Sequence, residues 1–179
     1  VHHNWIDTCS KYGINLAVGL VSLNVYNNVF RGCGRNTLRW GGLDSISTTD
    51  INITHNTIFQ PLSTSAYKTA ITRESNVMTL GSIKIQHNIV VLEVGASAGS
   101  TDYHDITAGE TNCTVSEDLY FDLSGTETTV PAKDTLSAYG NPLFTDYAAL
   151  NFTVATGSPA LGACTAAEAI AVADDYYGV

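Results

Sequence analysis

Apolar and polar residues alternate along much of the chain. In DINITHNTIFQ, residues 50–60, the apolar Ile51, Ile53 and Ile58 are separated by polar residues. Alternation with a period of two is typical of a strand that buries one face. The pair His55-Asn56 interrupts the alternation, and asparagine tolerates a left-handed backbone. The pattern therefore predicts two strands that are joined by a sharp bend at Asn56.

The same pattern recurs at four other places. It reads LNVYNNVF in residues 23–30, IKIQHNIV in 83–90, VSEDLY in 115–120 and, with a shortened first strand, VHHNWI at the beginning of the chain. The intervals between the equivalent positions are 24, 28, 32 and 30 residues, which excludes a strict solenoid such as a leucine-rich repeat. The residues at the equivalent position are Asn4, Asn28, Asn56, Asn88 and Asp118. We therefore expect repeated strand–bend–strand units with loops of variable length.

Stacking of these units would place the asparagines in one column. At the strand spacing of about 4.8 Å, each side-chain amide would hydrogen-bond to the next one and satisfy the polar groups of a buried bend. The alternative is an antiparallel β-sandwich, whose hairpins favour Asn-Gly or Asp-Gly turns. Neither dipeptide occurs in the chain.

A ladder of asparagines that follows this strand pattern resembles right-handed parallel β-helix proteins of the pectate-lyase-like superfamily. The resemblance is to the carboxy-terminal portion of such proteins. NPLFTD (141–146) and GSPALG (157–162) are similar to the tail that closes many secreted bacterial β-helix proteins. The resemblance implies an all-β fold with a right-handed parallel β-helix of about five turns over 1–122. The acidic extension 123–179 is expected to close it within the same domain. TAAE at 165–168 is a capping-box pattern that predicts a short terminal helix.

Length and charge narrow the function classes. The 179 residues suit one domain, and no apolar run is long enough to cross a bilayer. The net charge is −9, with one basic and twelve acidic residues in 101–179, which disfavours a nucleic-acid partner. Val1 begins inside a repeat, so we expect an excised or trimmed piece whose open amino-terminal end could stack on another copy.

The four cysteines suggest disulfides. Cys9 and Cys33 each follow a ladder asparagine by five residues, which would place their Cα atoms about 5 Å apart on adjacent turns. An even number of cysteines and the secreted family context favour bonding, with Cys113 and Cys164 as a second pair. The alternative is a stack of reduced, buried thiols at positions 9 and 33.

The resemblance also implies a site for an acidic polysaccharide. Lyases of this superfamily bind a sugar chain along one strand face and commonly use Arg or Lys to remove a proton next to a uronate carboxylate. Aligning YGINL (12–16) with NTLRW (36–40) directs Arg39 outward, so Arg39 is the catalytic candidate. The candidate substrate-binding residues are Lys11, Asn15, Arg35 and Arg73. The alternative is that Arg39 is an ordinary surface residue.

Ca²⁺ is the cofactor that the resemblance suggests. The V-W-I-D-H-like stretch of pectate lyases corresponds here to INITH (51–55), where Thr54 replaces the calcium-binding Asp, so activity by that mechanism is not expected. Weak metal candidates are Asp102, Asp105 and Glu110 in a polar insert. His3, His55 and His87 share a column that could hold Zn²⁺ or Cu²⁺ but offers no third ligand.

Three functions remain open from the sequence. The chain is expected to be a secreted polysaccharide lyase or hydrolase, a non-catalytic carbohydrate-binding or adhesive domain, or a structural unit that stacks into a filament. A converging acid–base set would favour the first, and exposed aromatic residues the second. The sequons at Asn52, Asn112 and Asn151 permit glycosylation in a source that glycosylates.

Overall fold

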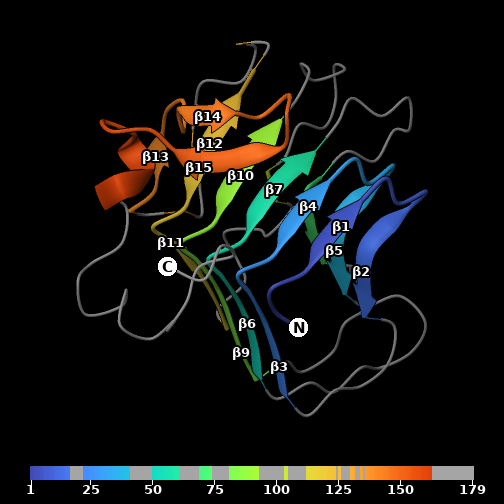
Figure 1. The fold of residues 1–179 in the computed structure, drawn as a ribbon. Helices are drawn as coiled ribbons and strands as arrows, with labels where there is room; N and C mark the ends of the chain where they lie inside the picture. Colours follow the sequence, from blue (N-terminus) through green and yellow to red (C-terminus); the bar gives the residue numbers. More distant parts are fainter. Residues whose placement is uncertain are drawn as a thin grey trace.

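The strands of the computed structural model form three parallel sheets (Figure 1). The structure describes residues 1–16, 22–40, 50–60, 69–73, 81–92, 103–104, 112–123, 125, 130–131, 134 and 136–162. The first sheet contains, in spatial order, β1 (Trp5–Asp7), β4 (Val29–Arg31), β7 (Thr57–Gln60), β10 (Ile89–Leu92), β12 (Leu119–Asp122) and β13 (Ala138–Tyr139). The second contains β3 (Ser22–Tyr26), β6 (Asp50–Thr54), β9 (Ser82–Gln86) and β11 (Cys113–Ser116). The third contains β2 (Tyr12–Leu16), β5 (Asn36–Trp40) and β8 (Ile71–Arg73).

Two passes of the chain visit the sheets in the same order, second, first and third. β3, β4 and β5 make one such pass, and β6, β7 and β8 make the next, so each pass adds one strand to every sheet. All pairings within the three sheets are parallel among the described residues. This confirms the all-β class with parallel strands, and the antiparallel sandwich is wrong.

The hydrophobic core lies between the three sheets. In the second sheet Val25, Ile53 and Ile85 are partners on adjacent strands, and all three are buried. The residue before each of them in its strand faces outward. Phe30 and Ile58 of the first sheet and Leu38 of the third pack into the same cluster. The alternation seen in the sequence therefore records one inward face for each strand.

The bends have a left-handed residue one position before the ladder, not at the ladder. The residues with positive φ are His3 (53°), Asn27 (52°), His55 (56°), His87 (58°) and Glu117 (59°). The expectation of left-handed backbone at Asn56 itself was therefore wrong. The physical reason is that the ladder side chain must point inward to hydrogen-bond along the column, so its neighbour makes the turn.

An antiparallel hairpin covers the outer face of the first sheet. β14 (Phe144–Asp146) and β15 (Asn151–Val154) lie against this sheet in Figure 1. Phe152 packs on Phe59 with ring centroids 4.7 Å apart, and on Trp5 at 5.3 Å. A short 3₁₀ helix, η1 (Pro159–Gly162), follows. The expected capping-box helix at 165–168 lies outside the described residues. No helix in the described part of the chain is long and apolar enough to span a membrane.

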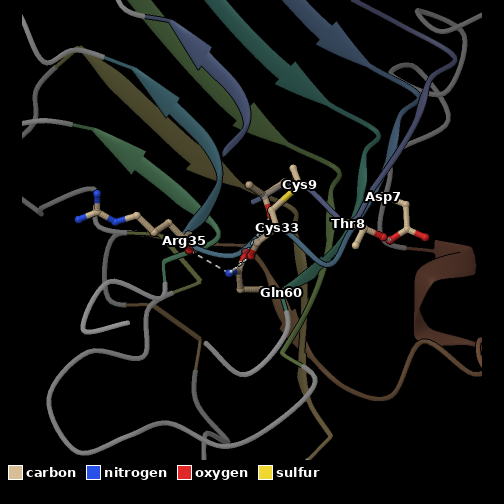
Figure 2. The surroundings of a disulfide bond; sticks show 7 residues. Asp7, Thr8, Cys9, Cys33, Arg35 and Gln60 are labelled. Atoms are coloured by element: carbon tan, nitrogen blue, oxygen red, sulfur yellow. Dashed lines mark hydrogen bonds between the residues drawn. A yellow bond between two sulfur atoms is a disulfide. The ribbon is translucent and has the colours of Figure 1, made fainter. Parts of the chain in front are cut away.

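A disulfide joins the corners before β2 and β5 (Figure 2). Cys9 and Cys33 form the expected pair, with Cα atoms 4.5 Å apart, so the stack of reduced thiols is wrong. The Gln60 side-chain amide donates to the carbonyls of Cys33 and Arg35, at 3.1 and 2.9 Å. A Cβ on Gly13 would lie 2.8 Å from the backbone oxygen of Thr37, so this close approach of β2 and β5 requires glycine. Cys113 is buried at the start of β11, and Cys164 lies outside the described residues.

Candidate functional site

The third sheet presents a cationic and aromatic cluster on its outer face. Nη1 of Arg39 donates to Oδ1 of Asn15 at 3.0 Å, and the Arg39 guanidinium lies 4.9 Å from the centre of the Tyr12 ring. Nη1 of Arg35 donates to the Tyr12 hydroxyl at 3.1 Å. One tyrosine therefore orients two guanidinium groups, through a cation–π contact and a hydrogen bond.

Adjacent strands bring these residues together. Asn15 pairs with Arg39 in the β2–β5 register, and the backbone N–H of Arg35 donates to the carbonyl of Lys11 at 2.9 Å. Lys11 and Asn15 are exposed, whereas Tyr12, Arg35 and Arg39 are half-buried. We call these five residues the Arg39 face. Their donors suit carboxylate groups, which guanidinium binds with paired hydrogen bonds.

Arg73 lies one register position away from Arg39. The β8 partner of Arg39 is Thr72, and Arg73 pairs with Trp40. Successive residues of a strand point to opposite faces, so the backbone register does not align Arg73 with Arg39. The Arg73 side chain lies outside the described part of the structure.

Tyr12 is the residue that the sequence interpretation missed. It begins the same strand as Asn15 and pairs in register with Asn36. The available signal was an aromatic residue within three positions of Asn15 and directly after Lys11. An aromatic ring beside two arginines can orient their guanidinium groups through cation–π contacts and hydrogen bonds.

The histidine column forms a second polar site. The rings of His55 and His87 lie 5.0 Å apart, and Nε2 of His87 is 2.7 Å from a carboxylate oxygen of Glu117. The His87 side chain is only 4% exposed. Beside this column is a cavity of about 200 Å³, which Val154 and Ala160 also line.

The described residues contain no group of three His, Cys, Asp or Glu side chains that could hold a metal ion. Thr54 pairs with Tyr26 and Gln86, so these three residues occupy the column where a calcium-binding acid was considered. The weaker metal candidates, Asp102, Asp105 and Glu110, lie outside the described residues.

The ladder residues make a continuous chain of hydrogen bonds along the bends. Nδ2 of each asparagine donates to the side-chain oxygen of the next rung, at distances between 2.9 and 3.0 Å. The rungs in order are Asn4, Asn28, Asn56, Asn88 and Asp118. The backbone N–H of each asparagine also donates to the following rung.

The last rung is an acid in an apolar environment. Burial raises the pKa of Asp118 from 3.8 to about 8, partly offset by the hydrogen bond from the backbone of Asn88. Burial and the neighbouring Asp118 and Asp134 also raise the pKa of Tyr120, and burial raises that of Asp134. The three groups form a buried cluster at the end of the ladder.

Comparison with known proteins gave no match, whether with protein-family models, with curated proteins or with solved structures. The Arg39 face and the buried polar groups of the ladder are therefore the features of this chain that bear on its function.

Proposed function

We propose that this chain is a secreted, right-handed parallel β-helix of about five turns, similar to the pectate-lyase-like superfamily, that binds an acidic polysaccharide. The parallel order of the three sheets supports the β-helix, and crossover connections between parallel strands are right-handed in about 98% of cases. The Cys9–Cys33 disulfide supports an oxidising compartment.

The observation that carries the proposal is the arrangement of Arg35 and Arg39 around Tyr12. Both guanidinium groups are already oriented, so less conformational entropy is lost when an anion binds. A strand face is extended, and consecutive rungs of a sheet lie about 4.8 Å apart. Such a face suits a linear chain that carries regularly spaced carboxylates.

The outer faces of the first and third sheets differ in how far a ligand can reach them. In the first sheet Val29, Phe59 and Val91 are buried with Phe152 of the hairpin, so that part of the face is closed to a ligand. Lys11 and Asn15 of the third sheet are exposed. This supports a glycan that lies along the third sheet.

The contacts of Arg39 favour binding over proton abstraction. The Arg39 guanidinium lies against the Tyr12 ring and donates to Asn15, so it is held as a hydrogen-bond donor, which is the role of a group that binds an anion. We therefore propose that Arg39 neutralises a carboxylate. Cleavage of the glycan is a separate question, which the same variants answer.

We expect Arg39→Ala to weaken binding to polygalacturonate or alginate by at least tenfold, because a charge-assisted hydrogen bond contributes about 1.5–3 kcal/mol. Isothermal titration calorimetry at two salt concentrations measures the loss. The matched control is Lys84→Ala, which removes an exposed cation from β9 in the second sheet and should leave the affinity unchanged. Equal losses in both variants would show a nonspecific charge effect and would contradict the proposal.

The lyase alternative is tested on the same polysaccharides by the ultraviolet absorbance of unsaturated uronate. Release of this product by the native chain and its loss in Arg39→Ala would make Arg39 catalytic. Absence of binding to every acidic polysaccharide in the panel would overturn the proposed function.

A further inference from the structure

Two carboxyl groups meet one tyrosine hydroxyl at the end of the asparagine ladder. Asp118 is 1% exposed and Asp134 is 9% exposed. The Tyr120 hydroxyl lies 2.7 Å from Oδ2 of Asp134 and 3.3 Å from Oδ2 of Asp118. An ionised carboxylate only accepts hydrogen bonds, and the hydroxyl has only one proton to donate. Both acids cannot be ionised and satisfied by Tyr120 at the same time.

The distances indicate where the protons lie. The shorter contact assigns the tyrosine proton to Asp134, so Oδ2 of Asp118 faces the hydroxyl oxygen. Oδ1 of Asp118 accepts from the backbone N–H and from Nδ2 of Asn88, at 2.6 and 2.9 Å. A proton on Oδ2 of Asp118 therefore completes the chain, with Asp118 donating to Tyr120 and Tyr120 donating to ionised Asp134.

The other rungs support the same proton position. In Asn28, Asn56 and Asn88, Nδ2 donates to the backbone carbonyl two residues earlier, at 2.9–3.0 Å. In Asp118 the atom equivalent to Nδ2 is Oδ2, and its neighbour is the Tyr120 hydroxyl at 3.3 Å. Only the protonated acid carries a donor at this atom, so neutral Asp118 resembles an asparagine rung in having a donor there, although its acceptor is Tyr120.

The backbone of Asp118 and Tyr120 holds β13, the last strand of the first sheet. The backbone N–H of Asp118 donates to Oγ of Ser137 at 2.6 Å, and the N–H of Ala138 donates to the Asp118 carbonyl at 3.0 Å. The N–H of Gly140 donates to the Tyr120 carbonyl at 2.9 Å. β13 contributes only two residues to the sheet, so it depends strongly on these neighbours.

We propose that Asp118, Tyr120 and Asp134 form a proton-dependent lock, which fastens β13 to β12 when the proton is shared and releases β13 when the proton is lost. Ionisation would place two buried carboxylates against one hydroxyl and would separate the segment of Asp134 from the ladder. Release of β13 would expose the edge of β12, whose backbone groups could then pair with a strand of another chain.

The direction of the pH effect follows from the raised pKa of Asp118. The closed form binds a proton up to about pH 8, whereas an opened form with an ordinary pKa near 3.8 releases it. The ratio of closed to open forms should therefore fall about tenfold per pH unit between about pH 4 and about pH 8, and level off above. The raised pKa of Asp134 adds to this loss at the acidic end of the window.

Other titratable groups stand nearby. Tyr103 and His104 pack against the Tyr120 ring, with centroids 4.5 and 6.3 Å away. His87 and Glu117 pair with each other on the adjacent bends. The test must therefore separate Asp118 from these groups.

The experiment is amide hydrogen exchange of Ala138 and Gly140, followed by NMR between pH 5 and pH 9 and corrected for the chemical exchange rate. In the native chain, protection should fall about tenfold per pH unit up to about pH 8. In Asp118→Asn it should be nearly independent of pH, because the amide supplies the donor permanently. Asp50→Asn is the control, since exposed Asp50 can keep its contact with Ser82, and it should follow the native chain.

Native protection that does not change with pH, or an Asp118→Asn slope equal to the native slope, would overturn the proposal. A second measurement needs no variant: the carboxyl carbon shift of Asp118 in ¹³C-labelled native protein. A protonated shift at pH 6 is expected. An ionised Asp118 at pH 6 would overturn the lock even if Asp118→Asn failed to fold.

Discussion

Asn56→Ala should lower the free energy of unfolding by about 3–5 kcal/mol. Oδ1 of Asn56 accepts from the backbone N–H and from Nδ2 of Asn28, at 3.2 and 2.9 Å. Its Nδ2 donates to three further oxygens, those of Val25, Thr54 and Asn88, each at 3.0 Å. Alanine would remove these hydrogen bonds from buried partners in the middle of the column, where a lost bond costs more than at the surface.

The matched control for this prediction is Asn52→Ala in the same strand. Asn52 faces outward, and its amide donates to Oδ1 of Asn24 at 2.8 Å in an exposed position. We expect a loss below about 1 kcal/mol, because water can replace this bond. Urea unfolding of the native chain and both variants gives the comparison. Similar losses in the two variants would contradict a buried, cooperative ladder.

Removal of the Cys9–Cys33 disulfide should cost about 3.5 kcal/mol, from the lost constraint on the unfolded chain. The two cysteines are 24 residues apart in sequence. We expect the double variant Cys9→Ala and Cys33→Ala to lose stability by this amount and to bind acidic polysaccharide more weakly, since the bond fixes the corners before β2 and β5. Urea unfolding and calorimetry measure the two effects.

The comparison variant is the double replacement Cys9→Ser and Cys33→Ser, which removes the same bond but places a different side chain at both corners. It should lose stability by a similar amount, because the lost constraint on the unfolded chain is the same. If either double variant unfolds at the same urea concentration as the native chain, the disulfide does not stabilise the corner.

The sequence was most informative where spacing defines position. Asn28, Asn56 and Asn88 occupy the same position in successive repeats. Aligning the repeats on these asparagines gives the register of the strands before and after each bend. The same alignment predicted the disulfide, because Cys9 and Cys33 each follow a ladder asparagine by the same number of residues. Parallel register could therefore be predicted before any contact was known.

The hairpin over the first sheet could not be placed from its own sequence. The signal was in the sheet, since Ile58-Phe59 and Val90-Val91 are apolar on consecutive positions. Consecutive apolar residues in a strand indicate burial of both faces, and the second face is covered by Phe152. The sequence pattern of the sheet shows that its second face is buried. It does not show which segment covers that face, because this depends on tertiary packing.

The acid cluster was missed for a different reason. Asp118 was recognised as a rung, but Asp134 comes from a segment without periodicity, and its contact with Tyr120 spans 14 residues. The Arg39 face was found in part. The alignment of β2 with β5 placed the candidates Lys11, Asn15, Arg35 and Arg39 on this face, whereas the role of Tyr12 depends on the direction of two long arginine side chains.

The central claim is that positions 4, 28, 56 and 88 lie above one another in parallel strands. Nuclear Overhauser effects in isotope-labelled protein test it directly. We predict contacts from the side-chain amide protons of Asn56 to the backbone amide of Asn28, and from the amide of Asn56 to the Asn88 side chain. Absence of these contacts, together with antiparallel contacts between residues 50–54 and 57–60, would contradict the fold and the proposals that depend on it.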